Sequence, residues 1–115
     1  MGSSPTAPTK NIYSMEKKDI YNCPKCAGIY LIKNKINGKC YIGQSIKLQK
    51  KIKSYFRDYT KEEYSDCDLY KSFKEYGIEN FELIILKIFR DALSNYTQQQ
   101  LDFWEDYYRK EYTNN

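Results

Sequence analysis

Histidine is absent from the 115-residue sequence, and its absence excludes several kinds of active site. A Ser-His-Asp triad, a Cys-His pair, a histidine metal ligand and a histidine general base all require that residue. Any acid–base chemistry must therefore come from Tyr, Lys, Asp, Glu or Cys. The chain has 13 tyrosines, which makes tyrosine a candidate for such chemistry.

Long hydrophobic runs are also absent. No apolar run approaches the roughly 20 residues that a membrane-spanning helix needs. Met1–Ser4 leads into polar residues and two prolines, so we expect no secretory signal. Disulfides are then not expected either. These absences together predict an intracellular protein of the cytoplasm, nucleoid or nucleus.

The chain has four cysteines, and the spacing of two of them leaves one alternative open. Cys23 and Cys26 form a C-x-x-C motif, which could be half of a zinc site. The other half would need a second close cysteine pair or histidines, and the sequence has neither. Inert thiols are the simpler interpretation, and a small zinc-knuckle interaction domain is the alternative.

Charge is unevenly distributed along the chain. Residues 1–60 contain 12 basic and 3 acidic residues, a balance of +9, whereas residues 61–115 contain 7 basic and 12 acidic residues, a balance of −5. A basic half suits a polyanionic partner and an acidic half can hold a cation. A merely soluble surface would give the same pattern.

Length and composition predict one folded domain. The chain is 41% hydrophobic and 17% aromatic, which favours a packed core over disorder. Residues 1–26 are expected to be a disordered or partly ordered tail, and residues 27–115 the domain.

The order of elements predicts an α+β fold. Residues 28–33 and 40–43 read as strands joined by a hairpin at Asn37-Gly38, because Asn-Gly is a strong turn signal. Apolar spacing predicts helices over 46–57, 66–76 and 98–112, and the apolar run 81–89 predicts a central strand. We therefore expect a small three-stranded antiparallel sheet flanked by helices, in the order ββααβα.

One carboxylate on the last predicted helix stands out. Leu101, Trp104 and Tyr108 mark a buried stripe, and Glu105 falls within its arc. An inward carboxylate is costly unless it is paired or bound to metal. Position alone leaves open an ordinary carboxylate that reaches solvent.

Two tripeptides in the predicted hairpin resemble the signature of a known family. Gly-Ile-Tyr at 28–30 and Tyr-Ile-Gly at 41–43 resemble the paired signature of the GIY-YIG nucleases, including homing-endonuclease catalytic domains. The segments 41–45 and 76–81 are similar too, and the resemblance covers most of residues 27–112. It implies a DNA endonuclease that hydrolyses phosphodiester bonds with a divalent metal, Mg²⁺ or Mn²⁺.

The resemblance also implies site residues. Tyr30 and Tyr41 would line the active site, with one of them, most often the second, activating water. Glu105 would bind the metal, and Tyr55 occupies a position that is usually His or Tyr. We expect Tyr30 and Tyr41 to share a pocket on the face of the sheet that carries Glu105, with Lys51 and Tyr55 facing it.

Lys51 departs from the family pattern, which has arginine at this position to hold the scissile phosphate. Arginine grips phosphate with a planar fork, whereas lysine is a compact point charge. The substitution supports an alternative function, a catalytically impaired domain that binds nucleic acid or protein.

Further lysines suit the DNA backbone, which supplies affinity without base information. They lie on the hairpin and on the first predicted helix: Lys33, Lys39, Lys47, Lys50 and Lys53.

Overall fold

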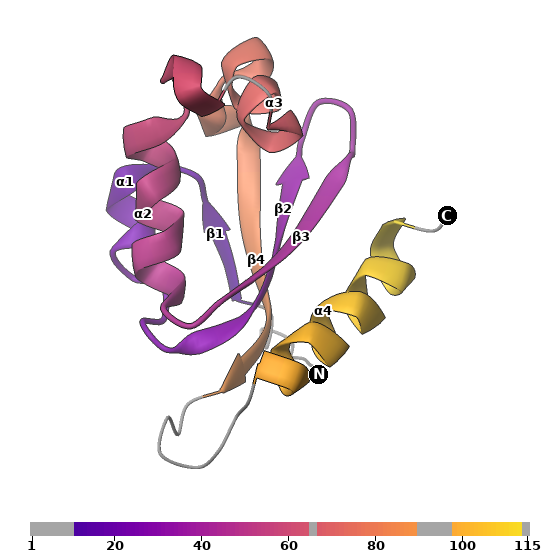
Figure 1. Cartoon of the computed structure of the whole chain (residues 1–115). Helices are drawn as coiled ribbons and strands as arrows, with labels where there is room; N and C mark the ends of the chain where they lie inside the picture. The colour runs from indigo at the N-terminus through magenta and orange to yellow at the C-terminus, as the bar shows by residue number, and fades with distance from the viewer. Residues whose placement is uncertain (1–10, 65–66, 90–97, 114–115) are drawn as a thin grey trace, which may run out of the picture.

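The computed structural model describes residues 11–64, 67–89 and 98–113, and their centre is an antiparallel sheet (Figure 1). Its strands are β1 (Asn11–Ser14), β2 (Ala27–Asn34), β3 (Cys40–Ser45) and β4 (Phe81–Phe89). They lie in the order β1-β4-β2-β3. β2 is therefore internal and β3 is an edge strand, so a helix or a ligand can approach β3 from the side.

Four α-helices and two short 3₁₀ helices flank the sheet. They are α1 (Lys17–Ile20), α2 (Leu48–Asp58), α3 (Asp68–Tyr76), α4 (Gln98–Thr113), η2 (Glu62–Tyr64) and η3 (Ile78–Asn80). The predicted α+β class is confirmed, and the predicted hairpin, helices and central strand are found within a few residues of their expected bounds. No helix in the described part of the chain is long and apolar enough to cross a membrane.

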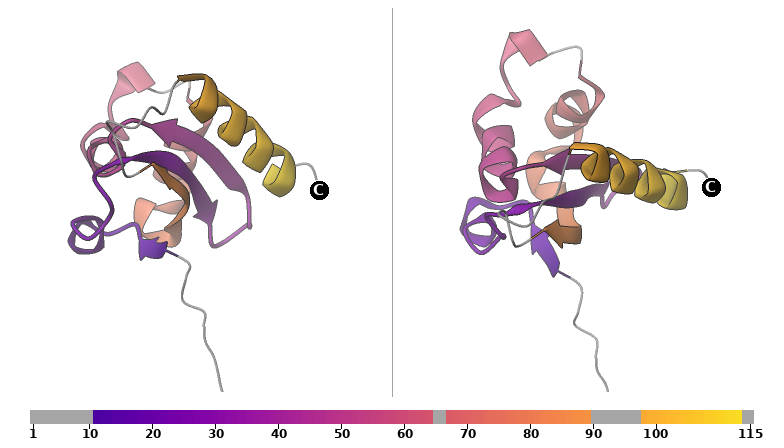
Figure 2. Two further views of the ribbon diagram at one scale, coloured as in Figure 1. Left: turned by 90° about the horizontal axis from the view of Figure 1, so that it is seen from below. Right: turned by 60° about the horizontal axis from the view of Figure 1, so that its bottom comes forward.

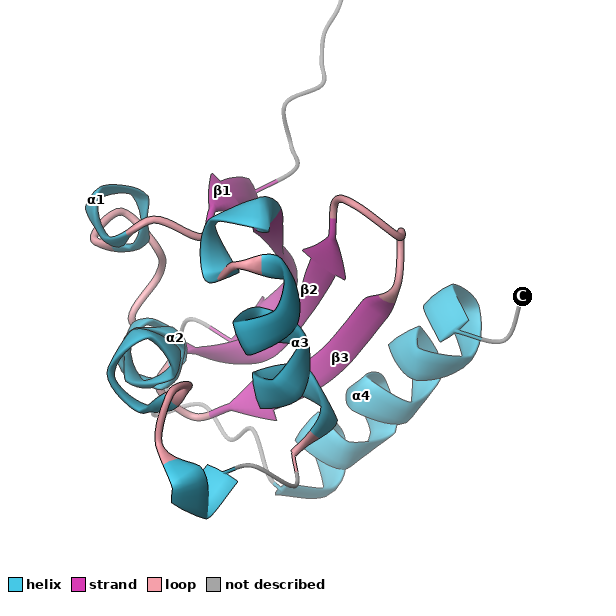
Figure 3. Cartoon of the chain, turned by 90° about the horizontal axis from the view of Figure 1, so that it is seen from above, coloured by secondary structure: helices cyan, strands magenta, loops and turns pink. Residues whose placement is uncertain are grey.

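The main core lies between one face of the sheet and helices α1, α2 and α3. Alternate residues of a strand point to the same face, and Tyr30 and Ile32 of β2 belong to this core. Figure 3 shows α3 over β2 and β3 when the chain is seen from above. The buried helix side chains that fill this side are Ile20, Leu48, Ile52, Tyr55, Leu69, Tyr70 and Phe73.

Helix α4 packs on the opposite face, alongside β3 (Figure 2). Ile29 and Leu31 alternate with the core residues of β2, and both are buried, as is Leu101 of α4. The Lys87 ammonium of β4 lies 4.4 Å from the centre of the Trp104 ring. The inward stripe predicted for this helix thus covers the second face of the sheet.

The expectation of three strands is wrong, because the sheet has a fourth strand, β1. Asn11 to Ser14 pair with Ile85 to Glu82 at the outer edge of β4. A strand of four residues shows too little alternation to be detected in a sequence, and its partner lies about 70 residues away. Residues 1–10 of the expected tail, and the connection between the predicted strand 81–89 and helix 98–112, lie outside the described residues.

The segment after α1 closes the amino-terminal end of α2. The carbonyl oxygens of Cys26 and Pro24 accept hydrogen bonds from the backbone N–H groups of Leu48 and Gln49 at 2.9 and 3.0 Å. These N–H groups would otherwise have no partner, since the first turn of a helix leaves them unpaired. The residues before the GIY tripeptide are thus integral to the fold.

Candidate active site

The two motif tyrosines lie on one face of the sheet. In the pairing of β2 with β3, Tyr30 is opposite Gly43 and Ile32 is opposite Tyr41. Residues directly opposite one another in an antiparallel pair share a face, and Tyr30 and Ile32 share one because they are two residues apart. Tyr30 and Tyr41 therefore both point toward α2 and α3.

The two motif glycines make room for close contacts. A Cβ atom at Gly43 would lie 2.6 Å from the Cζ and hydroxyl oxygen atoms of Tyr30. A Cβ atom at Gly28 would lie 2.3 Å from the backbone oxygen of Lys87. Neither contact is sterically possible, so the ring of Tyr30 can cross β3 only because residue 43 has no side chain.

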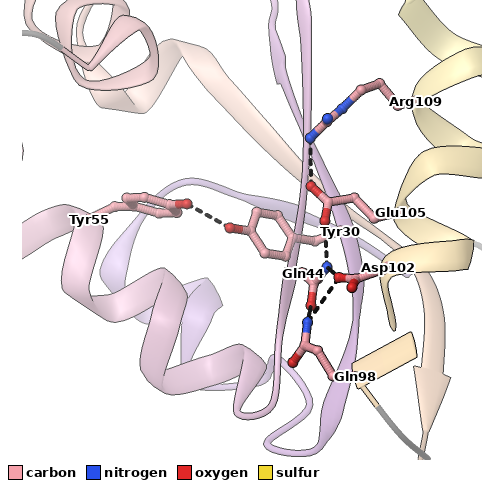
Figure 4. A network of polar contacts seen from close by, with 7 residues as sticks. All are labelled: Tyr30, Gln44, Tyr55, Gln98, Asp102, Glu105 and Arg109. Atoms are coloured by element: carbon pink, nitrogen blue, oxygen red, sulfur yellow. Dashed lines mark hydrogen bonds and ion pairs between the residues drawn. The ribbon is translucent and has the colours of Figure 1, made fainter. Parts of the chain in front are cut away.

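Tyr30 forms a hydrogen-bonded pair with Tyr55. Their hydroxyl oxygens are 2.6 Å apart, and the pair joins β2 to α2 (Figure 4). Burial raises the pKa of Tyr30 to about 12, and the nearby charge of Glu105 adds to this effect, although the hydrogen bond between Tyr30 and Tyr55 acts against it. Burial also raises the pKa of Tyr55. Both phenols are therefore neutral near pH 7.

Tyr41 occupies a different position from this pair. Its hydroxyl group is hydrogen-bonded to that of Ser72 on α3, with the oxygens 2.7 Å apart. The Lys39 ammonium lies 5.4 Å from the centre of its ring. Tyr41 is only partly buried, so it is more accessible to solvent than Tyr30 or Tyr55.

Glu105 reaches the strands from α4. One carboxylate oxygen accepts a hydrogen bond of 2.6 Å from the Gln44 amide, and the other accepts one of 2.6 Å from the Arg109 guanidinium. The side chain of Glu105 is 19% exposed. Gln44 is opposite Ile29 in the strand pairing, so Glu105 lies on the face that α4 covers.

The expectation that Glu105 shares a face with the tyrosines is therefore wrong. In Figure 4 the strands separate Tyr55 from α4, and Tyr30 and Glu105 approach the same strands from opposite sides. The inward stripe of a helix shows which side of the helix is buried, but not which face of the sheet buries it. Glu105 is nonetheless close enough for its charge to affect Tyr30.

A small polar network anchors the start of α4 to β3. The Gln44 amide nitrogen also donates to Asp102 at 2.9 Å, and the amide of Gln98 donates both to Asp102 and to the side-chain oxygen of Gln44. The hydrogen bond from Gln44, followed by that from Gln98, lowers the pKa of Asp102. The sequence interpretation did not assign Gln44 or Arg109 to the site, although the i, i+4 spacing of Glu105 and Arg109 is a recognisable ion-pair signal.

Lys51 lies beside Tyr55 at a basic cleft. Its ammonium is 5.4 Å from the centre of the Tyr55 ring. The cleft has a volume of about 400 Å³. Its lining comes from the end of β3, the following turn and α2: Ser45, Ile46, Lys47, Lys50, Lys51, Ser54 and Arg57.

The other lysines expected to contact DNA lie elsewhere. Lys33 is in β2, opposite Cys40, and Lys39 is in the hairpin next to Tyr41. Lys53 lies on another side of α2, where its ammonium is 4.4 Å from the centre of the Tyr21 ring. The five lysines therefore divide between the hairpin and two sides of α2.

The carboxylate of Glu105 is chemically suited to a hydrated Mg²⁺ or Mn²⁺ ion. Mg²⁺ accepts one or two protein carboxylates and retains several water molecules. Among the described residues no three His, Cys, Asp or Glu side chains come together to hold a metal ion. The site therefore fits an ion held by one carboxylate and water better than one enclosed by protein ligands.

The two cysteines of the C-x-x-C motif are free thiols, and Cys23 is buried. Burial, and then the proximity of Cys26, raises the pKa of Cys23 to about 11. The Cys23 thiol lies 3.6 Å from the carbonyl oxygen of Pro24, in the segment that caps α2. Without a bound metal ion, this thiol is protonated at neutral pH.

Comparison with known proteins connects this geometry to a family. A family model described as the GIY-YIG catalytic domain matches residues 26–115. The matched region includes both tripeptides, Lys51, Tyr55 and Glu105. β1 and α1 precede it.

A curated relative and two solved structures give the same result. Intron-associated endonuclease 1 of Enterobacteria phage T4 is 39% identical over 61 residues, which are 53% of this chain and 24% of the relative. The chain thus spans about a quarter of the length of that protein. The catalytic domain of intron endonuclease I-TevI, solved as a glutamate-to-alanine mutant, superposes with a TM-score of 0.62 at 31% identity, over 75% of this chain and 82% of that one. The catalytic domain of homing endonuclease I-TevI superposes with a TM-score of 0.58 at 31% identity, over 75% and 87% of the two chains.

Proposed function

This chain belongs to the GIY-YIG family, and from that membership we propose that it is a DNA endonuclease that hydrolyses phosphodiester bonds with a divalent metal ion. Because its proposed substrate is DNA, we expect it to act inside a cell. The names of its relatives, an intron-associated endonuclease and a homing endonuclease, support a substrate of this class.

The observation that carries the proposal is the hydrogen-bonded pair of Tyr30 and Tyr55 beside Lys51 and the basic cleft, with Glu105 close enough for its charge to affect Tyr30. The tyrosine pair meets on one side of β2 and β3 and the carboxylate on the other. Lys51 adds a cation next to Tyr55. Hydrolysis of a phosphodiester needs a base for water, positive charge near the phosphate and help for the leaving oxygen, and these residue types can provide all three.

Each side chain has a distinct role in this proposal. Burial raises the pKa of Tyr30 to about 12, so its phenol is neutral at pH 8. It therefore acts as a hydrogen-bonding group that orients water, with Tyr55 fixing its hydroxyl. The more accessible Tyr41 is the candidate general base.

In the same proposal, Lys51 and Glu105 offset the negative charge of the phosphate, Lys51 directly and Glu105 through a metal ion. Lys51 contacts the phosphate as a single cation. Glu105 would hold the metal, and Arg109 and Gln44 keep its carboxylate oriented until then. A bound divalent ion would supply a Lewis acid and stabilise the leaving oxygen.

The test is nicking of supercoiled plasmid with Mg²⁺ or Mn²⁺, with EDTA as the metal-free control. Glu105→Gln should keep the fold and reduce nicking by about 100-fold or more, because one essential electrostatic contribution is lost. Glu111→Gln is the matched control, since Glu111 is an exposed carboxylate on the same helix. Undiminished nicking by a folded Glu105→Gln protein would remove Glu105 from the site.

The second candidate function is an impaired nuclease domain that binds nucleic acid or protein. It is favoured by Lys51, whose ammonium cannot bridge two phosphate oxygens as a guanidinium does. This candidate predicts that the parent protein binds duplex DNA but leaves supercoiled plasmid intact with either metal. Metal-dependent nicking by the parent, abolished in Glu105→Gln, would exclude it.

A further inference from the structure

The residues before the family match form a surface of their own. β1 and α1 lie within residues 11–20, whereas the match begins at residue 26. Ile20 of α1 is buried in the core, and the Gln49 amide of α2 donates to the backbone oxygens of Tyr21 and Cys23 at 3.0 and 3.1 Å. The segment is thus held firmly against α2.

A second cleft lies between α1 and α2. It has a volume of about 310 Å³ and is lined by three cations, two aromatic rings and one aliphatic side chain. These residues are Lys17, Ile20, Tyr21, Lys53, Phe56 and Arg57. No carboxylate is among them, so the cleft favours an anion.

The two clefts share one residue, Arg57, and are therefore neighbours around α2. We call their combined surface the basic strip and define it by its six cations: Lys17, Lys47, Lys50, Lys51, Lys53 and Arg57. Asp58 accepts hydrogen bonds of 2.9 and 3.0 Å from Arg57, so part of that charge is offset. For the five lysines the structure gives no ion pair within the described residues.

We propose that the basic strip binds the phosphate backbone of duplex DNA that flanks the cleavage site, with α1 as its outer end. This inference rests on the proposed function, because the strip starts at Lys51 in the candidate active site. Its length favours a chain of phosphates over a single anion, since the cations are spread over α1, α2 and the turn before α2. Contacts of this kind position the duplex and carry no base information.

Tyr21 has a specific role in the outer cleft. The Lys53 ammonium lies 4.4 Å from the centre of its ring, a distance at which the ring attracts the cation. Tyr21 itself is 65% exposed. The ring therefore holds the Lys53 ammonium at the edge of the outer cleft and leaves its charge open to a phosphate.

The experiment measures binding of a fluorescent duplex at several salt concentrations in EDTA, so that cleavage cannot interfere. In the Lys17→Ala/Lys53→Ala double variant, the slope of log K against log salt should decrease by about 1.8, since each lost phosphate contact removes about 0.9. Lys18→Ala is the matched control, because Lys18 is adjacent to Lys17 but lies 3.7 Å from Glu16. It should leave the slope unchanged.

Three results would overturn the inference. The first is an unchanged slope in the double variant. The second is an equal decrease in Lys18→Ala, which would indicate net charge rather than a defined surface. The third is loss of binding to vesicles that contain phosphatidylserine with no loss of binding to duplex, which would assign the strip to a membrane surface. Because binding is measured without metal, a parent that binds with the expected slope but never nicks would contradict the proposed function and leave the strip intact.

Discussion

At the scale of single residues, the role proposed for Lys51 predicts how its side chain affects the rate of the reaction. The ammonium of Lys51 lies beside the ring of Tyr55 and at the edge of the basic cleft. A lysine in this position neutralises charge at one phosphate oxygen. A guanidinium would engage two oxygens at once, and this difference matters most in the transition state, where charge develops on the phosphate.

Lys51→Arg should therefore raise the nicking rate by about 10-fold or more, which corresponds to about 1.4 kcal/mol of transition-state stabilisation. DNA binding should change little, because both residues carry one positive charge and the salt dependence counts charges. Lys51→Ala should lose nicking. The measurement is the rate on supercoiled plasmid at saturating Mg²⁺. If Lys51→Ala nicks as fast as the parent, Lys51 does not contact the phosphate.

At the scale of helices and strands, the sequence predicted those elements that are long enough to show a period. The hairpin of β2 and β3 was found from Asn37-Gly38 and the two tripeptides, and β4 from nine apolar residues. β1 and α1 have four residues each, which is too short for periodicity. They are stable because of tertiary contacts, such as the pairing of β1 with β4, that no local pattern encodes.

The arrangement of the candidate site residues could not be predicted from the sequence. The motif resemblance proposed Tyr30, Tyr55 and Glu105; in the structure Tyr30 is hydrogen-bonded to Tyr55 of α2, and Glu105 of α4 is hydrogen-bonded to Gln44 of β3. The face occupied by α4 could not be inferred, because Leu101 and Trp104 would pack equally well on either side of a sheet. The link through Gln44 also depends on the strand register, and a shift of one residue would turn its side chain to the other face.

The contribution of α1 to stability can be measured at Ile20. Ile20 is 1% exposed, whereas Ile12 of β1 is 49% exposed. Ile20→Ala should lower the free energy of unfolding by about 2–5 kcal/mol, because it leaves a cavity in the core. Ile12→Ala should lower it by less than about 1 kcal/mol. Urea unfolding measures both. Equal, small effects would mean that α1 is not part of the cooperative unit.

At the scale of the whole molecule, the tyrosine pair connects the chemistry of the site to global stability. Tyr30 and Tyr55 join β2 to α2 through one hydrogen bond in the interior. Tyr55 also makes edge-to-face contacts with Tyr70 and Phe73 of α3. The side chains that would orient water are therefore also core side chains, and their protonation state is linked to folding.

The sign of this linkage follows from the raised pKa values. An unfolded tyrosine loses its proton near pH 10, whereas the native state keeps the proton of Tyr30 up to a pKa of about 12 and that of Tyr55 higher still. Above pH 10 the native state thus holds more protons than the unfolded state. The stabilisation is fully present below pH 10 and is lost as pH rises through the native pKa values.

Urea unfolding between pH 9 and pH 11 should therefore show a free energy of unfolding that falls above pH 10, by about 1.4 kcal/mol per pH unit for each retained proton. Tyr55→Phe should make the free energy of unfolding fall less steeply with pH. Phenylalanine keeps the ring contacts but has no phenol proton for the native state to retain. Tyr21→Phe is the control, since Tyr21 is an exposed tyrosine and its replacement removes no buried hydroxyl group. Burial also raises the pKa of Tyr13 and Tyr108, so part of the slope should persist in Tyr55→Phe. A slope that is the same in the parent and in Tyr55→Phe would mean that Tyr55 ionises without unfolding the chain, and that the pair is open to solvent.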